Sequence, residues 1–217
     1  MRPYPKIDTL FERAENHKID PLNLKLRRPV MADISRWVVT EKIDGTNIRV
    51  GLTNGSQQID IGGRTDNAQL PADLMKSLYE IFTVAKMESL FLPDTAIGTS
   101  ITLFGEGYGT GIQKGGDYRA DKGFTLFDAL IECDEHAYWQ DDATVTDFAH
   151  RLEIPRVPML GHWDLGRIVQ EVRDGIPSKA AWVRPRRAEG IVARPVEPLF
   201  DRRGQRLILK LKTGDFA

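Results

Sequence analysis

Residues 37–52 read WVVTEKIDGTNIRVGL, and this stretch decides the fold. Two runs rich in β-branched side chains, Trp37–Lys42 and Thr46–Leu52, flank a short turn with the sequence IDG. Runs of this kind on either side of a glycine-containing turn predict two β-strands. The first strand therefore ends at Lys42 and delivers this lysine to the turn.

The remainder of the chain alternates strand-like runs with helical patterns. Asn54-Gly55 is a strong hairpin signal and predicts that Thr46–Leu52 folds back on the strand that follows it. Further strands are predicted at 58–61, 100–106, 123–130, 190–194 and 206–212. Helices are predicted from Pro71 to Leu90, from Asp142 to Leu152, and from a cap at Asp164 through Arg173 with Gly175 just past the end.

Strands in antiparallel pairs with helices between them indicate an α+β fold. We find no internal repeat, low-complexity tract or linker, so we expect one domain over residues 1–217. The composition is 41% hydrophobic and 28% charged, which is ordinary for a globular protein. No apolar run reaches 18 residues and the N-terminus lacks the apolar core of a signal peptide, so we expect a cytosolic protein without a membrane span.

Cysteines, tryptophans and overall charge indicate no particular function. Cys133 is the single cysteine, which excludes an intramolecular disulfide and a multi-cysteine zinc site. The four tryptophans form no periodic stripe, and we interpret them as core or partly buried side chains. The net charge is −1, so any phosphate-binding surface would have to be local. Arginines do cluster late in the chain, either as a solvated face or as such a surface, at positions Arg184, Arg186, Arg187, Arg194, Arg202, Arg203 and Arg206.

The segment EKIDGTN, from Glu41 to Asn47, is the sharpest local feature. A lysine at the end of a rigid strand can act as a nucleophile when nearby cations or desolvation favour its neutral form. The alternative is an exposed lysine beside an Asp-Gly turn, which is common. The K-x-D-G pattern of Lys42 does not by itself separate the two interpretations.

Other segments supply groups that such a nucleophile would need. Glu106 ends a predicted strand in LFGEGYG, where three glycines leave room for a ligand to approach the backbone. Either Phe124 or Phe127 could stack on a purine. Glu189 opens the predicted strand EGIVAR, and the lysines of LILKLK alternate, so that Lys210 and Lys212 share one face of a strand. These two lysines either line the solvent side of an edge strand or bind phosphates.

Together these groups form one chemical set. A lysine attacks an α-phosphate, cations neutralise the charge that develops on the phosphoryl group, and carboxylates hold a divalent metal. An aromatic ring holds the base. Each group alone is a weak indication, but their joint presence favours nucleotidyl transfer.

In this respect the sequence resembles the covalent nucleotidyltransferase superfamily of RNA ligases, DNA ligases and mRNA capping enzymes. The resemblance extends from about residue 4 to 216. Its ordered motifs are KIDG (42–45), FGEG (104–107), FTLFD (124–128), EGIV (189–192) and LKLK (209–212).

Within the superfamily, the chain looks most like bacteriophage-type RNA ligases of the second class, relatives of the RNA-editing ligases. Asn47 extends the lysine motif in their manner, and Arg64 in GGRTDN and Gln113 in GEGYGTGIQ stand at the distances where those enzymes carry an arginine and a glutamine. The opening YPKIDTLFE resembles their N-terminal segment. The implied fold is an ATP-grasp-like adenylation domain with antiparallel sheets flanked by helices.

The resemblance implies an ATP-dependent RNA ligase. Lys42 would attack ATP to form lysyl-AMP, AMP would pass to a 5′-phosphate end, and a 3′-hydroxyl would displace it. The implied catalytic residues are Lys42, Glu106, Glu189, Lys210 and Lys212. Asp44, Glu106 and Glu189 would hold Mg²⁺ or Mn²⁺ directly or through water.

The resemblance also implies a nucleotide site. Lys210 and Lys212 would contact the AMP phosphate, and Lys210 or the metal would favour neutral Lys42. Phe127 would stack on adenine, and Glu41 would help to read it. The complete implied set is Glu41, Lys42, Ile43, Asn47, Arg64, Glu106, Phe127, Glu189, Lys210 and Lys212.

The sequence departs from the family pattern after Lys212, because only five residues follow where an OB-fold or helical domain is usual. We therefore expect the adenylation domain alone, as a monomer, with RNA a more probable partner than DNA. The arginines of 184–187 and 202–206 could take over part of the strand binding. Two alternatives remain open: a DNA or mixed-substrate polynucleotide ligase, and a nucleotide- or RNA-end-binding module without catalysis.

Overall fold

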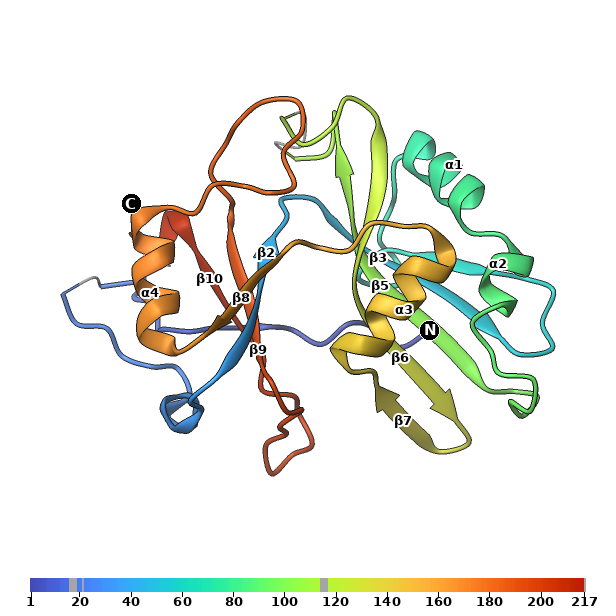
Figure 1. The fold of residues 1–217 in the computed structure, drawn as a ribbon, viewed down its shortest axis with the longest axis horizontal. Helices are drawn as coiled ribbons and strands as arrows, with labels where there is room; N and C mark the ends of the chain where they lie inside the picture. Colours follow the sequence, from blue (N-terminus) through green and yellow to red (C-terminus); the bar gives the residue numbers. More distant parts are fainter. Residues whose placement is uncertain (16–18, 21, 114–116, 217) are drawn as a thin grey trace. The chain divides into compact units, whose positions relative to one another are not determined.

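A computed structural model describes residues 1–15, 19–20, 22–113 and 117–216. The chain forms two compact units. Unit 1 comprises Met1–Pro5 and Asp44–Arg156, and unit 2 comprises Lys6–Ile43 and Val157–Ala217. The boundary therefore passes through the KIDG motif, between Ile43 and Asp44. Each unit has its own five-stranded sheet, so the predicted α+β class is confirmed (Figure 1).

The sheet of unit 2 carries the first predicted strand. Its strand order is β1-β10-β9-β2-β8, with antiparallel pairs except between β1 and β10. A helix, α4, packs on one face and shares a core with Trp37, Val39 and Leu211 through Ile168 and Val172. The elements are β1 (Asp8–Thr9), β2 (Trp37–Lys42), β8 (Met159–Trp163), α4 (Leu165–Asp174), β9 (Gly190–Pro195) and β10 (Leu209–Lys212), with short 3-10 helices at Pro29–Asp33 and Thr213–Phe216.

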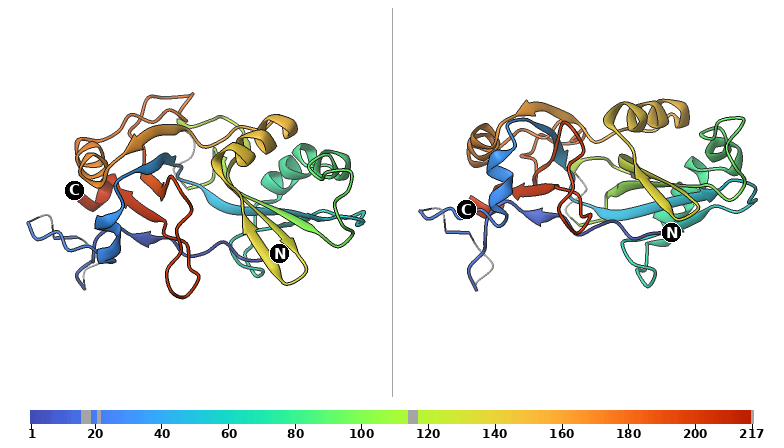
Figure 2. Two further views of the ribbon diagram at one scale, coloured as in Figure 1. Left: turned by 60° about the horizontal axis from the view of Figure 1, so that its bottom comes forward. Right: turned by 90° about the horizontal axis from the view of Figure 1, so that it is seen from below.

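The sheet of unit 1 is antiparallel, in the order β4-β3-β5-β6-β7. Figure 2 shows the same ribbon in two further views. Its helices contribute Leu74, Leu78, Met87 and Phe148 to a core with the apolar side chains of β3 and β5. The elements are β3 (Thr46–Thr53), β4 (Asp60–Gly62), α1 (Ala72–Ile81), α2 (Val84–Glu88), β5 (Ser100–Gly109), β6 (Lys122–Cys133), β7 (His136–Trp139) and α3 (Asp142–Leu152).

Most of the predicted elements are present, and many of their ends differ by one to three residues. The hairpin prediction at Asn54-Gly55 is confirmed, because β3 and β4 pair in antiparallel fashion. The predicted cap of α4 is also present: Asp164 accepts a hydrogen bond from the Arg167 N–H, and Gly175 follows the last turn. None of the helices in the described ranges is both long enough and apolar enough to cross a membrane.

The single helix predicted from Pro71 to Leu90 is wrong. The chain leaves the helical conformation at Phe82, whose backbone is extended (φ −104°, ψ 109°) and whose ring packs edge-on against Phe124. Thr83 then caps α2 by accepting a hydrogen bond from the Lys86 N–H. Burial of the Phe82 ring therefore divides the predicted helix into two.

The three glycines of LFGEGYG do not leave room for a ligand, contrary to the prediction. β5 continues to Gly109, so Glu106 lies within the strand and not at its end. A Cβ atom at Gly105 would overlap the Phe124 ring, and one at Gly107 would lie 2.9 Å from a methyl group of Leu74. Core side chains fill the space beside Gly105 and Gly107, and the backbone of Asp121 fills the space beside Gly109.

Candidate active site

Lys42 and its surroundings in unit 2 are positioned by three neighbouring strands. Gly190 on β9 pairs with Lys42 on β2 and with Lys212 on β10. Gly190 has a φ of +157°, and a Cβ atom there would collide with the Leu211 carbonyl, so only glycine fits between the two lysine-bearing strands. The residue before it, Glu189, is thus placed beside both lysines.

The Glu189 carboxylate bridges the two lysines. The Lys42 ammonium lies 2.6 Å from its Oε2 atom, and the Lys212 ammonium lies 2.6 Å from its Oε1 atom. Burial alone would raise the pKa of Glu189, but the charges of Lys42 and Lys212 and their hydrogen bonds outweigh that effect and lower it. The carboxylate therefore stays ionised between two cations, of which Lys42 is less exposed than Lys212 (23% and 40% of the side chain).

Lys210 shares its strand face with Lys212, as the alternation in LKLK predicts. Leu209 and Leu211 are fully buried in the core of unit 2, so the lysines between them point to the other face of the sheet. Lys42 pairs across Gly190 with Lys212 and so lies on this lysine face as well. Three cations and one carboxylate on one face of a sheet can bind and stabilise a phosphoryl group.

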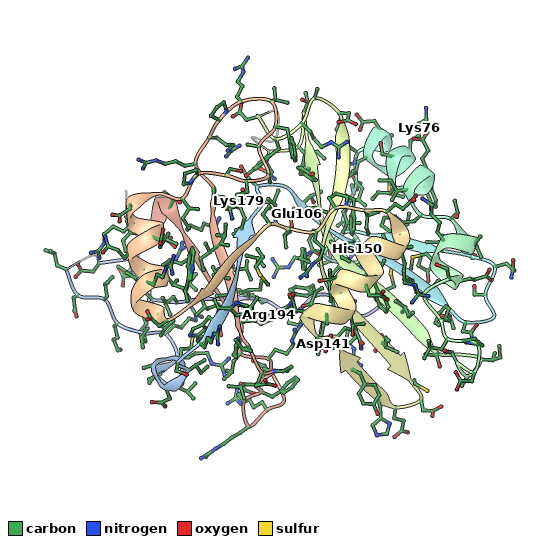
Figure 3. The ribbon with its side chains drawn as sticks, in the orientation of Figure 1. Lys76, Glu106, Asp141, His150, Lys179 and Arg194 are labelled. Atoms are coloured by element: carbon green, nitrogen blue, oxygen red, sulfur yellow. The ribbon has the colours of Figure 1, made fainter. Side chains whose placement is uncertain are left out.

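Glu41 lies on the opposite face from Lys42, since neighbouring strand residues point in opposite directions. Its side chain is buried, and its carboxylate accepts hydrogen bonds from the Ser178 hydroxyl and from the N–H groups of Lys179 (2.8 Å) and Ala180 (3.2 Å). Figure 3 labels Lys179 at this position. Glu41 thus anchors the segment after α4, a role that the sequence did not indicate, and its contact with adenine stays a prediction. Ile43 is buried beside this strand end.

Unit 1 brings two further predicted residues together. Asn47 on β3 pairs with Glu106 on β5, so their side chains lie next to each other on one face of the sheet (Figure 3 labels Glu106). The Oδ1 atom of Asn47 is buried and accepts no hydrogen bond. A half-buried carboxylate beside an unsatisfied amide oxygen fits a hydrated divalent cation, whose ligands are oxygens and whose waters donate hydrogen bonds.

The three predicted metal ligands do not form a cluster within one unit. Asp44 and Glu106 belong to unit 1, whereas Glu189 belongs to unit 2. Over the described ranges, no group of three or more His, Cys, Asp or Glu side chains is arranged to hold a metal ion. Mg²⁺ commonly keeps several waters and takes only one or two protein carboxylates. The amide oxygen of Asn47 and the carboxylate of Glu106 are therefore sufficient to bind one side of a hydrated Mg²⁺ ion.

The two candidate aromatic residues occupy different environments in β6. Phe124 is fully buried in the core of unit 1. Phe127 is half-buried and packs edge-on against Tyr4, with ring centroids 5.0 Å apart. A β-bulge leaves Phe127 unpaired between Leu126 and Asp128. Of the two rings, only Phe127 is partly exposed and so able to stack on a base.

Tyr4 and Arg49 were not predicted, yet both support the predicted residues of unit 1. The Tyr4 hydroxyl donates to buried Asp128 at 2.8 Å, which fixes the ring against Phe127. Arg49 follows Asn47 by two residues along β3, and its side chain is buried. Its guanidinium donates to the Gly63 carbonyl (2.7 Å), the Met1 carbonyl (2.8 Å) and Asp66 Oδ1 (2.7 Å). Arg49 is the single charged residue of β3, and this was the available signal for it.

Arg64 lies in the loop that Arg49 holds. The bonds of Arg49 to Gly63 and Asp66 fix the loop on either side of Arg64, whose own side chain is exposed. The predicted phosphate or ribose ligand is therefore presented on a loop with an anchored base.

Comparison with known proteins identifies the family and the fold of the chain. The profile of the family described as RNA ligase matches residues 35–212, which include the five ordered motifs from KIDG to LKLK. A glutamate-to-alanine variant of Naegleria gruberi RNA ligase with ATP and Mn superimposes with a TM-score of 0.64 at 19% identity, covering 96% of this chain and 57% of that chain. The Naegleria gruberi RNA ligase with PPi gives a TM-score of 0.62 at 18% identity, covering 98% of this chain and 62% of that chain.

These structural matches establish the fold, which the chain shares with the Naegleria gruberi RNA ligase. The chain spans about three fifths of the length of the solved chains it matches. The family match covers most of the chain from the first predicted strand to Lys212. The chain therefore belongs to the RNA ligase family.

Proposed function

We propose that this chain is an ATP-dependent RNA ligase whose nucleophile is Lys42. The observation that carries the proposal is the bridge from Lys42 through Glu189 to Lys212, on the face that also carries Lys210. A solvated lysine at a turn would have no need of a half-buried carboxylate and two further lysines around it. A nucleophile that attacks a polyphosphate needs both an orienting group and cations for the developing charge.

The proposed reaction has three steps. The neutral Lys42 amine attacks the α-phosphorus of ATP, so that a P–N bond forms, the α–β P–O bond breaks, and pyrophosphate leaves. An oxygen of an RNA 5′-phosphate then attacks the lysyl-AMP phosphorus, and the P–N bond breaks. Finally, a 3′-hydroxyl attacks the activated 5′-phosphate and AMP leaves as the phosphodiester forms.

The other residues of the lysine face would orient these groups. Glu189 holds the Lys42 side chain by its 2.6 Å contact. Lys210 or the metal would favour the neutral Lys42 amine, and the proton that Lys42 loses would pass to solvent. Lys210 and Lys212 would bind the AMP phosphate.

The remaining predicted residues would complete the nucleotide site. Phe127 would stack on adenine, Arg64 would contact ribose or phosphate, and Glu41 and Ile43 would border the base beside the strand of Lys42. A divalent metal, Mg²⁺ or Mn²⁺, would neutralise phosphate charge. Asp44, Glu106 and Glu189 would hold it directly or through water, with Asn47 accepting from a bound water.

Covalent labelling tests the proposal. The purified chain is incubated with α-labelled ATP or GTP and Mg²⁺, and protein-bound label is measured after denaturation. We expect label from ATP in the unaltered chain and none in Lys42→Ala. Lys76→Ala is the matched control, because Lys76 is an exposed lysine on α1 and should leave labelling unchanged.

The outcomes separate the proposed ligase from its alternatives. Absence of label with either nucleotide would favour a binding module, and label that survives Lys42→Ala would exclude Lys42 as the nucleophile. Sealing of nicked RNA, nicked DNA and hybrid duplexes is then compared in parallel. Equal or preferred sealing of DNA would identify a DNA or mixed-substrate ligase.

A further inference from the structure

The loop between α4 and β9 carries an exposed tryptophan that the proposed chemistry does not use. We define the Trp182 loop as residues 177–187; it is the orange segment that extends beyond the strands of unit 2 in Figure 1. Trp182 is 85% exposed and its neighbour Val183 is 48% exposed. The interpretation of all four tryptophans as core or partly buried residues is therefore wrong for Trp182. An indole left in water is a large apolar surface available to a ligand.

The charge of the loop differs from that of the chain. Residues 177–187 contain Lys179, Arg184, Arg186 and Arg187 and no acidic residue, a net charge of +4 in a chain whose net charge is −1. A local excess of cations of this size attracts a polyanion even when the whole protein is nearly neutral. The combination of an exposed aromatic ring with cations is the one that binds single-stranded nucleic acid.

The second arginine-rich loop provides an internal comparison. Residues 196–206 are also eleven in number and expose Phe200, but their three arginines stand against Glu197 and Asp201, a net charge of +1. Asp201 pairs with Arg28 at 2.8 Å and accepts hydrogen bonds from the N–H groups of Arg203 and Gln205. The loop's own Glu197 and Asp201 thus lower its net charge to +1 against +4 for the Trp182 loop, which favours the Trp182 loop as the element that binds a nucleic-acid strand.

The Trp182 loop is held at its base. Ser178 N–H donates to the Arg186 carbonyl (2.9 Å), and Ala188 N–H donates to the Ile176 carbonyl (2.8 Å). Glu41 binds Ser178, Lys179 and Ala180, as described above. An anchored loop loses less conformational entropy on binding than a free one, and its anchor is the residue next to Lys42.

We propose that the Trp182 loop binds a single-stranded RNA segment, with a nucleobase stacked on Trp182 and the adjacent phosphates bound by Arg184 and its neighbouring cations. The inference rests on the proposed function for the choice of RNA as the polyanion. Glu41 would act as the positioning residue that holds the loop beside the strand of Lys42. The RNA would thus be bound within unit 2 by the Trp182 loop, which lies between α4 and Glu189 in the sequence.

Fluorescence anisotropy with a 12-nucleotide single-stranded RNA, carrying a 5′-phosphate and a 3′-fluorophore, tests this proposal without ATP. We expect Trp182→Ala to weaken binding about 5- to 150-fold, the range that one base–aromatic stack supplies. Trp182→Phe should retain much of the affinity, because a phenyl ring still stacks. Arg184→Ala should weaken binding and lower the slope of log K against log salt by about 0.7.

Phe200→Ala and Arg202→Ala are the matched controls, since they remove an exposed aromatic residue and an exposed arginine from the other loop. They should leave RNA affinity within about twofold. Lys42 labelling by ATP is measured on every variant and should not change. Loss of RNA binding in Trp182→Ala supports the proposal whether or not the unaltered chain is labelled by ATP. Failure of the proposed ligase chemistry is therefore distinguishable from failure of the Trp182 loop to bind RNA.

Three results would overturn the proposal. The first is unchanged RNA binding in Trp182→Ala and Arg184→Ala. The second is an equal loss of RNA binding and of Lys42 labelling, which would assign Trp182 to the integrity of the lysine site. The third is sedimentation with vesicles of phosphatidylserine and phosphatidylcholine in the absence of any RNA affinity, which would identify a lipid surface as the ligand.

Discussion

The Lys42 ammonium and the Glu189 carboxylate lie 2.6 Å apart on neighbouring strands, and Lys212 binds the second oxygen of the same carboxylate. One anion therefore holds two cations on a half-buried face. Substitutions at Glu189 should consequently affect stability as well as chemistry, and the two effects should depend on pH in different ways.

Replacement of Glu189 by glutamine should destabilise the fold at neutral pH and have little effect in acid. The pKa of Glu189 is lowered below its ordinary value of 4.5, so its contribution to stability is present above that value and is lost as the pH falls through the folded-state pKa. The difference in urea midpoint between Glu189→Gln and the unaltered chain should be largest near neutral pH and shrink as the pH falls below 4.5. A difference that persists in acid would show that the ionised bridge is not its cause. Glu171→Gln, on an exposed ion pair of α4, is the control.

Loss of the Asn47 side-chain oxygen or of the Glu106 charge should weaken metal binding. Asn47→Ala takes away the buried Oδ1 atom that accepts no hydrogen bond, and Glu106→Gln removes a charge next to it. We expect the Mg²⁺ concentration for half-maximal Lys42 labelling to rise about 10- to 100-fold. Asn67→Ala, at an exposed turn, is the matched control. An unchanged Mg²⁺ dependence in Asn47→Ala would remove Asn47 from the metal's surroundings.

The two phenylalanines of β6 should separate stability from nucleotide affinity. Phe124→Ala empties a site in the core of unit 1 and should cost about 3–5 kcal/mol of unfolding free energy. Phe127→Ala should leave a folded protein whose ATP affinity falls about 5- to 150-fold, as expected for a lost base stack. Equilibrium binding of a fluorescent ATP analogue and urea unfolding measure the two quantities. Full ATP affinity in Phe127→Ala would exclude the proposed stacking.

Arg49 should act through stability and the loop that it holds, and Arg64 through activity. Arg49→Met keeps the apolar stem but leaves the buried Gly63 carbonyl without a donor, at a cost of about 1–3 kcal/mol. Arg64→Met alters an exposed side chain and should change stability by less than about 0.5 kcal/mol while lowering the rate of Lys42 labelling. Chemical unfolding and single-turnover labelling would measure both variants. Equal effects of the two substitutions on stability would contradict this division.

Sequence patterns predicted the elements whose determinants are local. The bounds of β2 and α3 match the predicted ranges Trp37–Lys42 and Asp142–Leu152, and the alternating lysines of β10 lie on one face as predicted. The order of motifs placed Glu189 in one site with Lys42, but as a metal ligand, and the ion pair between the two was found only in the structure. Each of these inferences uses residues that are close in sequence or strands that pair directly.

The features that were missed depend on contacts between distant segments. The division of the predicted helix at Phe82 depends on the Phe124 ring. Side chains from β6 and α1 fill the space beside Gly105 and Gly107. The anchoring of Ser178 by Glu41 links residues that are 137 positions apart. Short strands such as β1 and β7 have too few residues for a periodic pattern, so only their pairing defines them.

The bond from Arg49 to the Met1 carbonyl has a practical consequence for anyone who prepares this protein. The first residue belongs to the same hydrogen-bonded group as the loop of Arg64, and its side chain also lies against Gly51. A purification tag attached at Met1, or removal of Met1, would therefore alter the surroundings of Arg64, which is predicted to bind the nucleotide, although Met1 itself takes no part in the chemistry. Kinetic comparisons between variants should use one common N-terminus, with Met1 retained, so that differences in labelling can be attributed to the substituted residue.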